Sequence, residues 1–226
     1  LSFNLIIITF DIFIENFSQN SSVGRFRGFY LTICNLAWII SQLISGSIIT
    51  KSSFQGIYLF STLFMILVSI IFIFLLRDFQ EPKYKKHSTL KTIKAFIAHK
   101  NLSRIYLINL ILKLFYAWMV IYTPIYLNQH LGFNWGQIGI IFSIMLLPFI
   151  VLEFPLGKLS DRIGEKKILL FGFIVIIIST IMIPLIKTPT LYLWALVLLF
   201  TRIGAASIEI MSESYFFKFI NEENSD

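Results

Sequence analysis

Seven long apolar runs most constrain what this chain can fold into. They are Leu1–Phe17, Gly28–Ile49, Gly56–Leu76, Leu102–Leu127, Gly136–Leu156, Ile168–Ile186 and Thr190–Met211. About 20 mostly apolar residues in a helix cross the roughly 30 Å hydrocarbon core of a bilayer. An isolated strand cannot satisfy its backbone hydrogen bonds in lipid, and the alternating pattern of a barrel strand is absent from the sequence. The runs therefore predict an all-α, polytopic membrane helix bundle with seven transmembrane helices.

The composition supports a membrane protein and excludes several other classes. Of the 226 residues, 57% are hydrophobic and only 14% are charged, whereas a soluble domain has roughly 45–50% apolar and about 25% charged residues. The single cysteine, Cys34, lies within an apolar run and excludes an intramolecular disulfide framework. The net charge of +7 would suit nucleic acid, but the cations are concentrated between the apolar runs, where they report membrane topology. We therefore expect a lipid bilayer, and no nucleic acid, among the partners.

A basic linker, Arg77–Asn101, sets the expected orientation in the membrane. Its apolar residues recur at helical spacing, which suits either an amphipathic helix on the anionic cytoplasmic leaflet or a solvated basic segment. With this linker in the cytoplasm, fifteen of the nineteen lysines and arginines lie on the cytoplasmic side, two lie outside and two lie within spans. The positive-inside rule therefore places residues 77–101 and 157–167 in the cytoplasm. We expect an integral, multi-pass protein of the plasma (inner) membrane.

Three ionisable side chains within the spans are candidate substrate or ion contacts, because charges inside a bilayer are costly and mark functional sites. Lys113 lies about 11 residues into its span, or about 16 Å at 1.5 Å per residue, and is therefore near the midplane. It shares a helix face with Asn109 and Tyr116. Arg202 lies equally deep in the last span, and Glu153 lies near the end of the fifth.

Two interpretations of these charges stay open. Lys113 and Arg202 could contact an anionic or polar solute, with Glu153 as a proton carrier. Alternatively, one of the two cations pairs with Glu153 and only holds helices together. A milder polar stripe lies on the second span and consists of Asn35, Trp38, Gln42 and Ser45, whereas the third and sixth spans carry no charge. These patterns predict a bundle around a polar cavity, with the charge-free helices facing lipid.

Motifs for other chemistry are missing from the sequence. There is no Gly-x-x-x-x-Gly-Lys-Ser/Thr loop for nucleotide phosphates and no Gly-x-Ser-x-Gly nucleophile elbow. His87, His99 and His130 lie in connections without metal-ligand spacing. A membrane enzyme would need a catalytic constellation at the interface, and none is visible. We therefore expect no enzyme activity, no catalytic residues, no metal and no cofactor.

The polar stretch Gly157–Lys167, between the fifth and sixth runs, resembles a known signature. It consists of Gly-Lys-Leu-Ser-Asp-Arg-Ile-Gly-Glu-Lys-Lys, and we expect a loop that joins two antiparallel helices. The cytoplasmic signature of the major facilitator superfamily is Gly, three residues, an acid, a base, any residue, Gly, any residue and two bases. Its defined positions are filled here by Gly157, Asp161, Arg162, Gly164, Lys166 and Lys167.

The resemblance covers nearly the whole chain and implies a twelve-helix protein of which seven helices are visible. In that family a copy of the signature joins the eighth and ninth helices, and the basic linker resembles the central cytoplasmic loop. The chain then corresponds to helices four to ten. Residues 1–76 would end the N-terminal half, 77–101 would be the linker, and 102–226 would start the C-terminal half. Since the sequence begins inside an apolar run, we expect a truncated protein.

A repeat of acidic pairs fits the family's six-helix repeat. Asp11 and Glu15 lie in the first span, and Glu209 and Glu213 lie at the end of the last, offset by 198 residues. Both pairs have a spacing of four residues, which places the two acids on one face of a helix.

The resemblance implies a secondary active transporter that moves a small solute by alternating access. Lys113 and Arg202 would lie on the cavity-lining helices seven and ten. Asp161 would face the positive N-terminus of a helix in the other half, and Arg162 would pair with Glu213, so that both contacts latch the cytoplasmic side. A channel, or a membrane-embedded interaction protein without carrier activity, is the alternative, although neither would require the signature.

Overall fold

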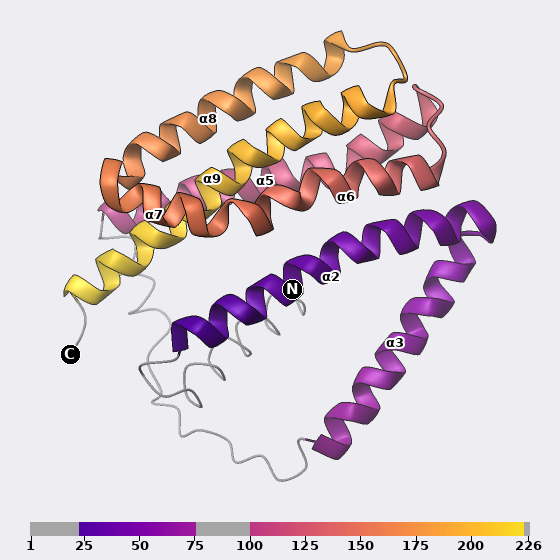
Figure 1. The fold of residues 1–226 in the computed structure, drawn as a ribbon, viewed down its shortest axis with the longest axis horizontal. Helices are drawn as coiled ribbons and strands as arrows, with labels where there is room; N and C mark the ends of the chain where they lie inside the picture. Colours follow the sequence, from indigo (N-terminus) through magenta and orange to yellow (C-terminus); the bar gives the residue numbers. More distant parts are fainter. Residues whose placement is uncertain (1–22, 76–99, 224–226) are drawn as a thin grey trace.

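The computed structural model describes residues 23–75 and 100–223 (Figure 1). The expected first span, Leu1–Phe17, and nearly all of the basic linker lie outside the described residues. Within these two segments the chain is almost entirely helical and contains no strand. The prediction of an all-α fold is confirmed.

Seven α-helices and one 3-10 turn make up the described part of the chain. They are α2 (Val23–Lys51), α3 (Phe54–Leu75), α5 (Lys100–Gln129), α6 (Trp135–Val151), α7 (Glu153–Ile163), α8 (Glu165–Met182), the 3-10 turn η1 (Ile183–Leu185) and α9 (Leu191–Glu223). Helices α2, α3, α5, α8 and α9 are long and apolar enough to cross a membrane, and α6 is a shorter apolar helix. The spans predicted within the described residues therefore form helices in the predicted order.

Helix α9 is the centre of the bundle. Its most apolar stretch is 61% buried, against at most 17% for the other four long helices. It packs against α5, α6, α7 and α8 (Figure 1). One apolar cluster joins it to α6 through the fully buried Trp194 and Leu198, and a second joins it to α8 through Ala205 and Ile208. The last predicted span is therefore the one most enclosed by protein.

Helices α2 and α3 form an antiparallel hairpin that opens away from its turn near Lys51. Helix α2 runs along α6, whereas α3 points away from the other helices (Figure 1). None of the most apolar stretch of α3 is buried, and this helix carries no charged residue. An exposed, charge-free apolar helix suits lipid contact, because lipid is the solvent in which such side chains cost nothing to expose. This exposure agrees with the expectation that the third span faces lipid.

Glycines let two pairs of helices approach closely. Between α8 and α9, a Cβ atom on Gly204 would lie 2.7 Å from the carbonyl oxygen of Gly172. Between α2 and α6, a Cβ atom on Gly139 would lie 2.6 Å from the carbonyl oxygen of Gln42, and one on Gly46 would be equally close to α6. Small residues are typical where membrane helices pack backbone to backbone.

A buried serine adds a polar link between α2 and α6. The Ser143 hydroxyl is 3.1 Å from the carbonyl oxygen of Ile39 on α2 and 2.8 Å from that of Gly139 on its own helix. A hydroxyl group at a helix interface in lipid contributes about 0.6–2 kcal/mol when it bonds across helices. The two helices are thus held near Gly46 and Gly139 by close packing and by this hydroxyl.

The predicted run Gly136–Leu156 does not form one straight helix, and this prediction was wrong at its end. Helix α6 begins at a capping box in which Asn134 and Gln137 satisfy each other's backbone N–H groups. It ends at Val151, and α7 follows after a single residue. Pro155 has no N–H to donate to the carbonyl group of Val151, and its ring crowds that carbonyl, so the helix is interrupted there. Helical hydrogen bonds continue on both sides of the break.

The stretch Gly157–Lys167 is mostly helical, which corrects the prediction of a loop. Residues 157–163 belong to α7, and the turn between α7 and α8 is the single residue Gly164, whose φ is 84°. This backbone conformation strains any residue with a Cβ atom. Leu156 and Ser160 are buried at a spacing of four residues, which favours a helix with one face on the bundle. Only the second glycine of the signature is therefore required by the turn.

Candidate functional site

A cavity of about 670 Å³ lies between α2, α5, α6 and α9. This volume falls in the range of about 300–1,000 Å³ that ligand pockets usually have. Most of its wall is apolar. Its polar and charged lining residues are Asn35, Gln42, Ser45, Lys113, Tyr116, Arg202, Glu209 and Glu213. The predicted polar cavity is therefore present, and it collects side chains from helices far apart in the sequence.

The polar stripe predicted on the second span lines this cavity completely. Asn35, Trp38, Gln42 and Ser45 recur at spacings of three and four on α2 and all contribute to the wall. Such spacing places side chains on one face of a helix. The packing of α2 along α6 turns this face towards α5 and α9.

Glu209 of α9 is the acceptor for two side chains of α5. The Lys113 ammonium group donates to Oε1 in an ion pair, and the Tyr116 hydroxyl donates to Oε2 at 2.8 Å. The Lys113 side chain is 59% exposed and that of Glu209 is 19% exposed. Both oxygens of the Glu209 carboxylate thus accept hydrogen bonds from side chains on one turn of α5. Glu209 therefore fixes the register of α5 against α9.

Arg202 lies deep in the same cluster and is only 4% exposed. Its guanidinium carbon is 4.9 Å from the centre of the Tyr116 ring, a distance at which a cation is attracted by an aromatic face. Its Nε atom is buried and has no hydrogen-bond partner among the described residues. Tyr116 therefore contacts Arg202 with its ring face and Glu209 with its hydroxyl group.

Only some of the predicted site residues lie together in the structure. Lys113, Tyr116 and Arg202 come together, whereas Asn109, one turn earlier on α5, does not line the cavity. Lys113 pairs with Glu209; the pairing of a cation with Glu153, considered from the sequence, stays a prediction. Glu153 begins α7 instead of ending a span, and its side chain lies outside the described residues.

Glu209 is the residue that the sequence-based reasoning missed as part of the site. The signal was available, because Glu209 and Glu213 form an acidic pair in the last span. From the sequence, Glu209 was assigned to an internal repeat and given no role at the site. Glu213, expected to pair with Arg162, also lines the cavity.

The signature residues lie at the opposite end of the bundle from Lys51. Arg162, Lys166 and Lys167 have exposed side chains on α7 and the start of α8. The side chain of Asp161 lies outside the described residues. Helix α7 packs against α9, which carries Glu213. The latch contacts of Asp161 and Arg162 stay predictions.

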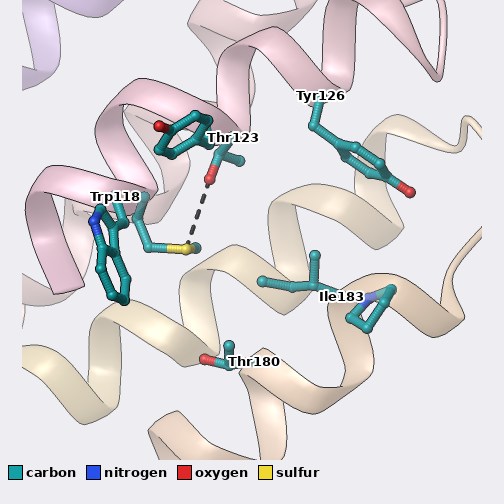
Figure 2. A pocket seen from close by; sticks show the side chains of 8 residues that line it. Trp118, Thr123, Tyr126, Thr180 and Ile183 are labelled. Atoms are coloured by element: carbon teal, nitrogen blue, oxygen red, sulfur yellow. Dashed lines mark hydrogen bonds between the residues drawn. The ribbon is translucent and has the colours of Figure 1, made fainter.

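A second cavity of about 510 Å³ lies between α5 and the end of α8 with η1 (Figure 2). Trp118, Thr123 and Tyr126 line it from one side, and Thr180 and Ile183 from the other (Figure 2). No charged residue is part of its wall. The Thr180 hydroxyl oxygen is buried without a hydrogen-bond partner among the described residues. Charged side chains can select a polar solute, and of these two cavities only the first is lined by them. The first cavity is therefore the candidate functional site.

Comparison with known proteins gives one family and one partial relative. The family model "Major Facilitator Superfamily" matches residues 4–224. The chain is 25% identical over 117 residues to the "Multidrug efflux pump SdrM" of Staphylococcus aureus (strain N315). That alignment covers 51% of this chain and 26% of the relative, so the aligned part of the chain spans about a quarter of the relative's length. No solved structure matches significantly.

The family match and the fold agree. The described residues form apolar helices of membrane-spanning length with a cavity between them that is partly lined by polar side chains. The signature residues of Gly157–Lys167 lie on α7, on α8 and in the turn between them. The family model spans nearly the whole chain, well beyond the signature that first suggested it. The chain is an integral, multi-pass membrane protein and belongs to the Major Facilitator Superfamily of transporters.

Proposed function

We propose that this protein is a secondary active transporter that moves a small solute across the membrane by alternating access. The observation that carries the proposal is the cavity of about 670 Å³ with its charged cluster of Lys113, Tyr116, Arg202 and Glu209. Transporters of this type bind their substrates near the bilayer midplane, between two helical halves. Here α2 supplies one wall and α5, α6 and α9 supply the other.

The boundaries of the two halves are part of this proposal. Residues 1–76 end the first half, 77–101 form a cytoplasmic linker, and 102–226 begin the second half. Helix α2 then belongs to one half and α6 to the other. The close contact of Gly46 with Gly139 becomes the contact between halves that closes the outer end of the cavity. Alternating access requires this contact to part in each cycle.

The cytoplasmic end would be closed by the signature residues in the opposite state. Asp161 would meet the positive N-terminus of a helix in the first half, near Gly24–Gly28, and Arg162 would pair with Glu213. Gly164 provides the turn that holds these side chains between α7 and α8. Lys166 and Lys167 complete the basic, cytoplasmic face.

The solute is small and is anionic or polar, with a co-transported proton as the coupling ion. Lys113 and Arg202 supply the cationic groups. Glu209 is a second candidate for the proton carrier beside Glu153, because its carboxylate lines the cavity and contacts Lys113 and Tyr116. The name of the staphylococcal relative, an efflux pump, favours export as the direction.

The test is counterflow in proteoliposomes that contain the full-length protein. Vesicles preloaded with unlabelled solute should transiently concentrate the labelled form, since a carrier exchanges solutes across the bilayer without net driving force. A channel shows no such accumulation, and a membrane-embedded interaction protein shows no flux. An Arg202→Gln variant should lose counterflow. A Lys187→Gln variant, altered at an exposed lysine outside the cavity, should retain it.

A further inference from the structure

Arg202 carries a positive charge that the other side chains of the cluster do not fully balance. The side chain is 4% exposed and its Nε atom is buried without a hydrogen-bond partner among the described residues. A buried donor without a hydrogen-bond partner is destabilising, and more so when the group is charged. The Tyr116 ring partly compensates the charge at 4.9 Å but offers no acceptor to Nε.

The acids that line the cavity do not supply the missing partner. Both oxygens of Glu209 already accept hydrogen bonds, one from Lys113 and one from Tyr116. Glu213 lies eleven residues after Arg202 on the same helix, a rise of about 16 Å, and its side chain is exposed. Glu209 is shared with Lys113, so the side chains that the structure describes compensate the positive charge of Arg202 only in part.

The rest of the deep wall is apolar and rich in aromatic rings. Phe142 is buried, and Phe149 meets the Tyr116 ring edge-on at a centroid distance of 6.2 Å. Trp38 of α2 lines the opposite wall and is 50% exposed. A wall of this kind favours a ligand with a flat aromatic ring, since aromatic rings pack against one another in offset or edge-to-face contacts.

We propose that the cavity binds a small organic monoanion with an aromatic body. Its carboxylate or sulfonate accepts charge-assisted hydrogen bonds from the guanidinium group of Arg202, which lines the cavity, and its ring lies between Trp38 and Phe149. This inference rests on the proposed transport function and names the substrate class for the same cavity. An organic cation of the same shape would be repelled by the partly compensated positive charge of Arg202.

The experiment uses three probes that share one ring system and differ in charge. They are 2-naphthoate, neutral 2-naphthalenemethanol and cationic 2-naphthylmethylammonium. Equilibrium dialysis with the full-length protein in nanodiscs of neutral phosphatidylcholine measures the three dissociation constants. We expect 2-naphthoate to bind about tenfold or more tightly than either other probe, because hydrogen bonds to charged groups are the strong ones. Tighter or equal binding of the cation or the alcohol would overturn the proposal.

Two variants connect the preference to Arg202. In Arg202→Gln the affinity for 2-naphthoate should fall to that of the alcohol, whereas Arg202→Lys, which keeps the charge, should still prefer the anion. Lys187→Gln is the matched control and should bind like the wild-type protein. An unchanged preference in Arg202→Gln contradicts the proposal. The wild-type comparison of the three probes stands by itself if a variant fails to fold.

Counterflow of labelled 2-naphthoate separates this inference from the proposed function. Selective binding with counterflow supports both. Selective binding without any counterflow supports the anion site and overturns the transport function. Counterflow of another solute without selective binding of 2-naphthoate overturns the anion site and leaves the transport function standing.

Discussion

At the scale of single residues, Glu209 is the acceptor on which the charged cluster depends. Its two oxygens receive the Lys113 ammonium group and the Tyr116 hydroxyl group. Tyr116 in turn places its ring face under Arg202. Loss of the Glu209 charge would therefore remove the ion-pair partner of Lys113 and a negative charge from the cluster.

Replacement of Glu209 by Gln should make transport by the full-length protein insensitive to pH. The amide keeps the size of the carboxyl group but neither carries a charge nor gains a proton. Initial rates of counterflow across a range of pH values measure the effect, and Glu153→Gln is the matched variant. If Glu153→Gln flattens the pH profile and Glu209→Gln leaves it unchanged, the proton carrier is Glu153.

Replacement of Tyr116 should separate the role of its hydroxyl group from that of its ring. Tyr116→Phe removes a hydrogen bond to a carboxylate, worth about 1.5–3 kcal/mol, and keeps the ring next to Arg202. Tyr116→Leu also removes the cation–π contact, worth about 0.5–2 kcal/mol. The free energy of unfolding in bilayers should fall more for Leu than for Phe. Tyr192→Phe, whose ring is 81% exposed, should change little; equal losses for Phe and Leu would show that the ring contributes nothing.

The sequence predicted part of the site, and physical reasons explain which part. Lys113 and Arg202 could be found because a charge within an apolar run is costly wherever it lies. Their partners could not, since Lys113 and Glu209 are 96 residues apart and meet only through the packing of α5 on α9. Asn109 was included by helical spacing alone, which cannot distinguish one turn from the next.

At the scale of elements, glycines determine how closely the helices pack. The backbone of Gly204 touches that of Gly172, whereas a Cβ atom on Gly157 would meet nothing within 4 Å. The same residue type therefore has a packing role in α9 and none that the backbone requires in α7. Substitutions to alanine test this difference directly.

Gly204→Ala should destabilise the protein by about 1–3 kcal/mol, because the new methyl group forces α8 and α9 apart. Gly157→Ala should be neutral or stabilising by about 0.5–1 kcal/mol, since alanine suits a helix better than glycine. Unfolding in bilayers compares the two variants. Equal effects at both positions would contradict the packing at the α8–α9 contact.

Asp161→Asn should slow transport without blocking membrane insertion. If Asp161 faces a helix N-terminus in the closed cytoplasmic state, loss of its charge removes about 0.5–2 kcal/mol, which corresponds to a change of about 2- to 30-fold. Counterflow rates, corrected for the amount of protein in the membrane, measure the loss. Lys158→Gln, an exposed neighbour on α7, is the control. Unchanged kinetics in Asp161→Asn would exclude the latch.

The sequence predicted which helices form, but not where each helix begins and ends. Runs of about 20 apolar residues identified every long helix of the described part. The interruption of Gly136–Leu156 depends on Pro155, and Pro148 in the same run lies inside a helix without ending it. The polar stretch after it was expected to be a loop because it is hydrophilic. Its helix forms because Leu156 and Ser160 bury one face against the bundle.

At the scale of the whole molecule, the cavity is bounded by helices from both proposed halves. Cys34 of α2 is the sole cysteine of the chain and lines this cavity. Its thiol group can therefore report which side of the membrane reaches the cavity.

Gly139→Val should shift the protein towards the state that is open to the outside. A side chain at this position meets the Gln42 carbonyl oxygen and prevents the close approach of α2 and α6. Labelling of Cys34 by a membrane-impermeant maleimide added outside should therefore become faster than in the wild type. Cys34→Ser should abolish this labelling, and Lys187→Gln, altered at an exposed residue outside the cavity, should leave its rate unchanged. Slower external labelling in Gly139→Val would contradict the proposed outer contact.

The contact of Gly46 with Gly139 also has a consequence for the speed of opening. Burial of a long side chain costs up to about 2 kcal/mol of rotamer entropy, but glycine has no rotamers to lose. Where the two proposed halves meet at Gly46 and Gly139, these two positions add no side chain that must be ordered each time the contact forms. At these two positions the proposed contact between halves can therefore be close without an entropic cost from side chains, which would favour its repeated opening and closing.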